Sequence, residues 1–255
     1  MAVILWHIEA SHYNEKVRWA LDYKQIPHER RVPMPGLHGF KALALTRGGQ
    51  RRLPVIEIDG RRVGDSTAII AALERYRPEP ALYPADETER ARALELEDFF
   101  DERLAPEIRR LVWHHTIDDP DAVVAAVMPN APDSRKRLLR ALGPVARRSV
   151  RLDYRVSEQS AAQARERVIA AMDRLESELL PSGFLVGDRF SVADLTAASL
   201  FTPLLAPPQR QYLPASIAPV LLPLREELSA RPGGQWIFEM FVRYRGRSAE
   251  IPAAA

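Results

Sequence analysis

The 255-residue sequence contains no cysteine. Disulfide bonds, thiolate-ligated metal sites and cysteine nucleophiles are therefore excluded. Lysine is scarce as well, because all but four of the 36 basic residues are arginines. No apolar run approaches the roughly 20 residues that span a bilayer, and the first residues lack the basic segment of a secretory leader. We therefore expect a cytoplasmic protein with no membrane partner.

The charges nearly balance, since 36 basic residues face 34 acidic ones and the net charge is +2. So small an excess gives no argument for nucleic-acid binding, and we predict no nucleic-acid partner. The segment 135–155 differs, because it carries eight basic residues against one acidic residue, Asp153. Such a segment suits an anionic partner, but we favour a solvated helix face that is balanced by acidic neighbours.

The length exceeds that of a typical single domain, and hydrophobic residues at 46% suffice for a sizeable core. Strand-like patterns are confined to the first quarter of the chain. A proline-dense linker follows at 77–84, and beyond it the patterns are almost entirely helical. We predict two domains, residues 1–80 and residues 86–246.

The first domain reads as alternating strands and helices followed by a hairpin. Residues 3–8 form a nearly continuous apolar run, as in a strand buried on both faces. A helix from Ser11, a short polar edge strand over 28–32 and a short helix near 40–46 follow. Asp59-Gly60 then closes a hairpin between two short β-prone runs, and a last helix extends to Arg77. The predicted order is βαβαββα.

Both ends of this hairpin carry groups suited to a ligand. Pro54 precedes the first strand, where a cis bond would leave the backbone of Leu53 free to bind a ligand. Asp65 and Ser66 follow the second strand and offer a carboxylate, a hydroxyl and unpaired helix-start N–H groups. Such a place suits a ligand with both an ammonium and a carboxylate, such as the end of an amino acid.

Ser11 lies where the first strand leads into the first helix. The helix dipole and free N–H groups stabilise an anion there, including a thiolate on a bound ligand. Taken alone, Ser11 is more simply a helix N-cap. Together with Pro54 and the Asp65-Ser66 pair, the interpretation as a binding group is favoured.

These motifs resemble the glutathione S-transferase superfamily. The similar segments are Leu53-Pro-Val-Ile, the turn that leads to Asp65-Ser66, and Ser-x-x-x-x-Lys-Val-Arg from Ser11. The resemblance implies that Leu53 beside a cis Pro54 pairs with the cysteinyl part of glutathione. It also implies that Asp65 and Ser66 hold the γ-glutamyl end, and that Ser11 is the catalytic residue that holds glutathione as a thiolate.

Two positions after Ser11 depart from the family pattern. His12 stands where proline is common, and Asn14 stands where glutaredoxin-like members have a second cysteine. Tyr13 between them is a candidate substitute donor to the thiol. Arg52 is included in the predicted glutathione site, and the other candidates for the glycine carboxylate are His38, Lys41, Arg47, Gln50 and Arg51.

The second domain resembles the all-α C-terminal domain of the same family. Ser191 and Asp194 have the spacing of a capping box, and Phe190 and Leu195 have that of a hydrophobic staple. The amphipathic pattern over 86–115 predicts one long helix, with a kink at Pro106. Near its end, Arg109, Arg110, Trp113 and His114 are within reach of a cleft between the domains.

The pair His114-His115, with Asp118-Asp119 nearby, superficially suggests a metal site. Adjacent histidines point in different directions on a helix, so we predict no metal there.

The resemblance implies a thioredoxin-like α/β domain followed by an all-α domain, in a homodimeric glutathione S-transferase of the detoxification type. Its partners would be a small-molecule thiol, with glutathione as substrate, and an electrophile. One alternative is a non-catalytic binding or assembly module that acts through 135–155. Another is a thiol-dependent isomerase or dehalogenase. The sequence leaves the electrophile, the identity of the thiol and the oligomeric state open.

Overall fold

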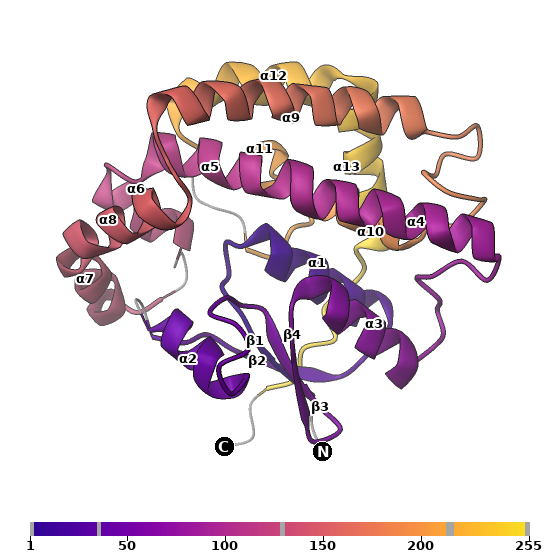
Figure 1. Cartoon of the computed structure of the whole chain (residues 1–255), viewed down its shortest axis with the longest axis horizontal. Helices are drawn as coiled ribbons and strands as arrows, with labels where there is room; N and C mark the ends of the chain where they lie inside the picture. Colours follow the sequence, from indigo (N-terminus) through magenta and orange to yellow (C-terminus); the bar gives the residue numbers. More distant parts are fainter. Residues whose placement is uncertain (1–2, 35–36, 128–130, 213–216, 253–255) are drawn as a thin grey trace.

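The structure is a computed structural model, and it describes residues 3–34, 37–127, 131–212 and 217–252. A four-stranded sheet with three helices forms one half of the molecule, and helices alone form the other half (Figure 1). This arrangement confirms the predicted thioredoxin-like α/β domain followed by an all-α domain. The boundaries 1–80 and 86–246 stay a prediction.

The elements of the first half follow the predicted order. They are β1 (Val3–Trp6), α1 (His12–Tyr23), β2 (His28–Arg31), α2 (His38–Leu45), β3 (Val55–Ile58), β4 (Arg61–Gly64) and α3 (Ser66–Tyr76). The strand order is β2-β1-β3-β4. The β1–β2 pair is parallel, whereas β1–β3 and β3–β4 are antiparallel. Leu5 lies opposite Ile56 in the middle of the sheet, and both side chains are fully buried.

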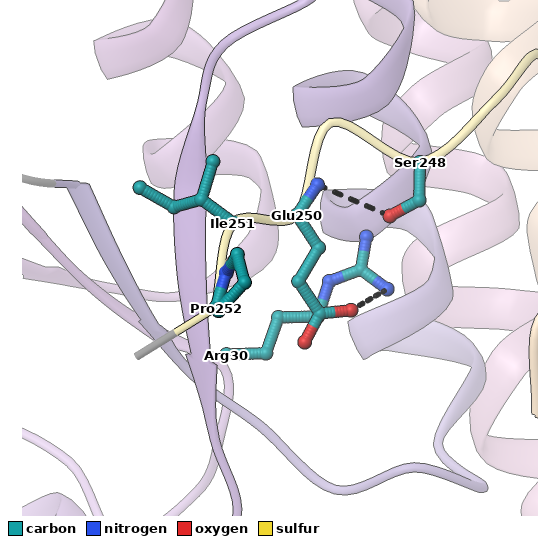
Figure 2. A pocket seen from close by; sticks show the side chains of 5 residues that line it. All are labelled: Arg30, Ser248, Glu250, Ile251 and Pro252. Atoms are coloured by element: carbon teal, nitrogen blue, oxygen red, sulfur yellow. Dashed lines mark hydrogen bonds and ion pairs between the residues drawn. The ribbon is translucent and has the colours of Figure 1, made fainter. Parts of the chain in front are cut away.

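The tail after the last helix returns to the sheet and covers the edge of β2 (Figure 1). The His28 N–H donates to the carbonyl of Ala249, and the Ile251 N–H donates to the carbonyl of His28. The tail and Arg30 line a shallow hollow, in which Arg30 lies 3.5 Å from the carboxylate of Glu250 (Figure 2). The strand β2 lies at the edge of the sheet, as predicted, and backbone pairing with the tail covers part of that edge.

The second half is a stack of helices. These are α4 (Glu87–Phe99), η1 (Phe100–Leu104), α5 (Ala105–Thr116), α6 (Pro120–Val127), α7 (Asp133–Ala141), α8 (Gly143–Asp153), α9 (Glu158–Glu178), α10 (Val192–Leu200), α11 (Thr202–Leu205), η2 (Pro219–Leu221), α12 (Leu222–Ala230) and α13 (Pro232–Tyr244). The predicted kink at Pro106 is misplaced by about one turn. The irregularity is the π-helical turn η1, and Pro106 lies in the first turn of α5, where its missing N–H is tolerated.

The capping box at the start of α10 forms as predicted. The Asp194 carboxylate accepts hydrogen bonds of 2.8 Å from the backbone and hydroxyl of Ser191 and from the backbone N–H of Leu185. Burial raises the pKa of Asp194 to about 6. The Phe190 ring packs against Trp19, so this turn also connects the helical half to α1.

Helix α1 lies between the sheet and the helical half, and it is buried on every side. Its apolar residues are buried, and so are its charged residues. The Lys16 Nζ lies 2.8 Å from Glu97 and 2.5 Å from Asp101. On another side, Arg245 from the end of the chain lies 2.7 Å from Glu15 and 2.8 Å from Asp22. Buried charges of this kind need partners, and here other elements supply them.

Candidate glutathione site

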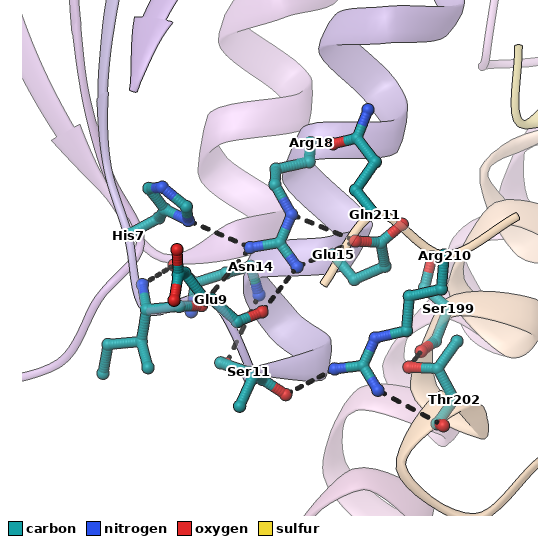
Figure 3. Close-up of polar contacts among 12 residues, drawn as sticks. His7, Glu9, Ser11, Asn14, Glu15, Arg18, Ser199, Thr202, Arg210 and Gln211 are labelled. Carbon is teal, nitrogen blue, oxygen red and sulfur yellow. Dashed lines mark hydrogen bonds and ion pairs between the residues drawn. The ribbon is translucent and has the colours of Figure 1, made fainter. Parts of the chain in front are cut away.

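Ser11 is the N-cap of α1 and lies next to the corner that contains Pro54. Its Oγ accepts a long hydrogen bond (3.4 Å) from the backbone N–H of Asn14. The Asn14 side chain accepts from the N–H of Ile8 (3.3 Å) and donates to the carbonyl of Leu53 (3.4 Å). Asn14 is fully buried below Ser11 (Figure 3) and connects the loop that carries Ser11 to Leu53. The Ser11 hydroxyl proton has no acceptor among the residues that the structure describes, so it is available to a ligand.

The Leu53–Pro54 peptide bond is cis, and Leu53 is buried. In the described part of the chain, the Leu53 N–H donates no hydrogen bond. Gln50 closes the other side of this corner, since its side-chain amide donates to the carbonyls of Arg52 (2.8 Å) and Pro54 (3.1 Å). The amide of Gln50 fills the space above Gly64, where a Cβ would lie 2.3 Å from it. Gln50 thus supports the corner and is not a free group for a carboxylate.

Asp65 and Ser66 lie at the start of α3. The Asp65 Oδ1 accepts from the N–H groups of Thr67 (3.0 Å) and Ala68 (3.1 Å), which leaves Oδ2 without a partner in the described chain. Asp65 is exposed and has φ 69° and ψ 132°, a conformation that costs a non-glycine residue about 1–3 kcal/mol. Ser66 is buried beside it. Backbone strain of this kind is concentrated at ligand-binding sites.

The candidates for a glycine carboxylate occupy different environments. The Lys41 Nζ lies 3.9 Å from the centroid of the Trp6 ring. Arg52 is exposed next to Leu53, and its guanidinium lies 5.8 Å from the centroid of Tyr154. The side chains of His38, Arg47 and Arg51 are also exposed.

Tyr13 is not positioned as a substitute donor to the thiol. Its hydroxyl donates to the backbone carbonyl of Asp101, at 2.7 Å, in the π-helical turn. Burial raises the pKa of Tyr13 well above its usual value. The hydroxyl therefore remains protonated and connects α1 to η1.

His12 is buried and connects α1 to α5. Its Nε2 lies 3.2 Å from the carbonyl of Ala105, a distance at which the neutral ring donates. Burial lowers the pKa of His12 to about 3, and the positive charges of Arg109 and Arg210 act in the same direction. The imidazole is therefore neutral near pH 7.

Arg210 is a residue of this site that no sequence motif indicates. It follows α11 and is buried, and its Nη2 donates to the carbonyl of Ala10, at 2.5 Å, directly before Ser11 (Figure 3). Its Nη1 also donates to the carbonyl of Thr202, at 3.4 Å. Arg210 thereby fixes the backbone before α1 from the helical half.

Two family models match the chain. The glutathione S-transferase N-terminal domain matches residues 5–81, and the glutathione S-transferase C-terminal domain matches residues 158–229. The chain belongs to the glutathione S-transferase superfamily. The elements α4, η1, α5, α6, α7 and α8 lie between the two matched segments of the chain.

Individual relatives agree with the family. The chain is 33% identical over 106 residues to maleylacetoacetate isomerase of Dictyostelium discoideum, a match that covers 36% of this chain and only 44% of that protein. The fold is similar to that of the β-etherase LigF from Sphingobium sp. strain SYK-6, with 22% identity, 94% and 99% of the two chains covered and a TM-score of 0.61. It is also similar to a glutathione S-transferase from Methylobacterium radiotolerans in complex with glutathione sulfonate, with 21% identity, full coverage of both chains and a TM-score of 0.52.

Among the described residues, no three His, Asp or Glu side chains group as metal ligands would. His114 and His115 pack edge to face with ring centroids 4.7 Å apart. None of the described helices combines the length and the hydropathy needed to cross a bilayer.

Proposed function

We propose that this glutathione S-transferase binds glutathione along the corner formed by Leu53 and Pro54 and activates its thiol beside Ser11. The observation that carries the proposal is the bridge through Asn14. It brings the start of α1 next to the backbone of Leu53, whose N–H is unoccupied in the described chain. The related structure with glutathione sulfonate supports glutathione as the thiol.

Each predicted residue has a role in this proposal. Leu53 pairs its backbone with the cysteinyl unit, and the free Oδ2 of Asp65 binds the ammonium of the γ-glutamyl end. Ser66, at the start of α3, receives the carboxylate of the same end. Arg52 binds the glycine carboxylate. The Ser11 hydroxyl donates to the sulfur, and the α1 dipole further favours the thiolate.

The activated sulfur then attacks a small electrophile that is held against the helical half. A sulfur lone pair forms the new C–S bond, and the leaving group departs with the electrons of the broken bond. In an addition, the electrons of the double bond move to the neighbouring atom, which takes up a proton. Transferase activity follows from either course.

Thiol-dependent isomerisation is the second candidate, and the match to a maleylacetoacetate isomerase favours it. In that reaction the thiolate would add to a double bond, a bond would rotate, and the thiolate would leave again. Product analysis separates the two candidates. A transferase consumes glutathione in proportion to product, whereas an isomerase returns it unchanged.

A purely non-catalytic module is less favoured, because the basic segment 135–155 is partly neutralised. Arg147 and Arg151 lie 3.4 Å and 2.7 Å from Asp118, and Arg140 lies 2.8 Å from Asp121. These pairs support the prediction of a helix face that acidic neighbours balance. The homodimer and the cytoplasmic location stay predictions, and sedimentation of the purified protein would test the first.

The experiment is a calorimetric titration with glutathione, combined with the pH dependence of the ultraviolet absorbance of the bound thiolate. Wild type should bind glutathione with a lowered thiol pKa. Ser11→Ala should raise that pKa by about one to two units, because a hydrogen bond to a charged group contributes about 1.5–3 kcal/mol.

Ser157→Ala is the matched control. Ser157 caps α9 through the same kind of bond, accepting from the N–H three residues on (Ser160, 3.2 Å), but it lies outside the proposed site. An equal pKa change in both variants, or none in Ser11→Ala, rejects Ser11 as the activating residue.

A further inference from the structure

Arg109 on α5 is a half-buried cation that has no anionic partner among the residues the structure describes. Its guanidinium carbon lies 4.2 Å from the centroid of Tyr154 and 5.8 Å from that of Tyr13. Its Nε is buried and makes no hydrogen bond, and no described carboxylate lies within 4.0 Å of it. Aromatic faces stabilise a guanidinium, but they do not replace an anion.

The neighbouring residue Arg110 shows the contrast. It forms an ion pair with Glu107 and donates to the carbonyl of Tyr154 at 3.1 Å. Arg167 occupies the other oxygen of Glu107, at 2.9 Å. The nearest acid on α5 is therefore already used, and Arg109 cannot share it.

A second guanidinium approaches the same ring from the other half of the molecule. Arg52, which precedes Leu53, lies 5.8 Å from the centroid of Tyr154 and has no ion pair in the part of the chain described here. Burial lowers the pKa of Arg109, and the positive charge of Arg52 lowers it further. The two guanidinium groups lie on the same aromatic ring and repel each other. Their combined positive potential therefore favours an anion beside the Tyr154 ring.

This place adjoins the site that was described for glutathione. Tyr13 and His12 follow Ser11 directly, and the charge of Arg109 reaches both. A negative group on Arg109 would therefore lie near the thiolate that Ser11 holds. Arg52 is assigned to glutathione itself, so Arg109 is left for the molecule that the thiolate attacks.

We propose that Arg109, packed on Tyr154, binds a carboxylate or similar compact anion of the second substrate, so that the preferred electrophiles are acids. This inference rests on the proposed function and specifies its substrate class. Arg109 would be a specificity-determining residue, because it favours acidic over neutral electrophiles of the same shape.

The test compares 4-chloro-3,5-dinitrobenzoate with its neutral amide as electrophiles for glutathione. Wild type should show the higher kcat/KM with the benzoate. Arg109→Met should lower kcat/KM for the benzoate by about 10- to 100-fold, as expected for loss of a charge-assisted bond, and change that for the amide less than about two-fold. Arg109→Lys should restore part of the benzoate activity. Arg103→Met removes an exposed arginine of η1 and should leave both substrates unaffected.

Three results would overturn the inference. Equal losses with benzoate and amide would make Arg109 merely structural. A weaker glutathione Kd with unchanged discrimination between the electrophiles would assign the anion to glutathione. No preference of wild type for the benzoate would remove the proposed substrate class.

Failure of the proposed function is a separate result, seen as no glutathione binding by wild type. In that case calorimetry with the benzoate alone still tests Arg109, which should bind it in wild type and not in Arg109→Met.

Discussion

His12 should make the stability of the protein sensitive to mild acid. Its folded pKa is about 3 because of burial and the charges of Arg109 and Arg210, whereas the unfolded value is near 6.5. Below pH 6.5 the His12 imidazole is therefore protonated in the unfolded chain but stays neutral in the folded chain. Stability falls as the pH is lowered from about 7, and this contribution levels off only near pH 3.

The size of the effect follows from the same two values. Between pH 7 and pH 5, protonation of one such histidine in the unfolded chain favours unfolding by about 2 kcal/mol. Burial also lowers the pKa of His28 to about 4 and that of His7 well below its usual value, so both residues add to the loss of stability. Asp194 acts in the opposite direction, because its raised pKa lets the folded state take up a proton first.

A comparison of wild type with His12→Gln isolates one residue from this sum. The glutamine amide can still donate to the carbonyl of Ala105 but does not titrate. Chemical denaturation at pH 7 and at pH 5 gives the free energy of unfolding of both proteins. The variant should lose about 2 kcal/mol less than wild type between the two pH values, whatever its stability at pH 7. Identical losses would show that the His12 ring is protonated in the folded protein, and the reasoning from burial would be wrong.

Three further substitutions test the site and its supports. Asp65→Asn keeps the cap of α3 but removes the charge, so calorimetry should show glutathione binding weakened by about 1–3 kcal/mol; unchanged affinity would remove Asp65 from the site. Lys16→Met leaves two buried carboxylates without their cation and should lower the free energy of unfolding by about 3–5 kcal/mol, measured by denaturant titration. A loss below about 1 kcal/mol would contradict that account. Arg210→Met frees the carbonyl of Ala10 before Ser11, and the bound thiol pKa should rise by roughly half a unit to one unit; Arg210→Lys should reverse part of the change.

Features contained in a short segment could be predicted from the sequence. The hairpin, the cap of α1 and the box at Ser191 and Asp194 each depend on a few neighbouring residues, and they form where expected. The order of strands and helices followed from the same local patterns.

Contacts between distant residues could not be predicted in this way. Asn14 binds the carbonyl of Leu53 across 39 positions, and the Tyr13 hydroxyl binds Asp101 across 88. Arg210 reaches Ala10 across 200 positions. None of these partners is implied by a local period or spacing.

Helix α1 shows why the burial of some charged side chains could not be predicted from the sequence. Its apolar residues indicated one buried face, and charged residues on the other faces usually mean exposure. Lys16 and Arg18 are nevertheless fully buried, because carboxylates on α4, on η1 and on α1 itself surround them.

The returning tail limits how this protein can be divided. Arg245 supplies a second cation for Glu15 and Asp22, and Ala249 and Ile251 complete the backbone bonding of His28. A fragment that stops after the first 80 residues would keep both carboxylates, with Arg18 and Arg30 as their remaining partners, and would lose the guanidinium that lies between them. Chimaeras that graft this first half onto another helical domain would have to carry residues 245–251 along as a separate, non-contiguous piece.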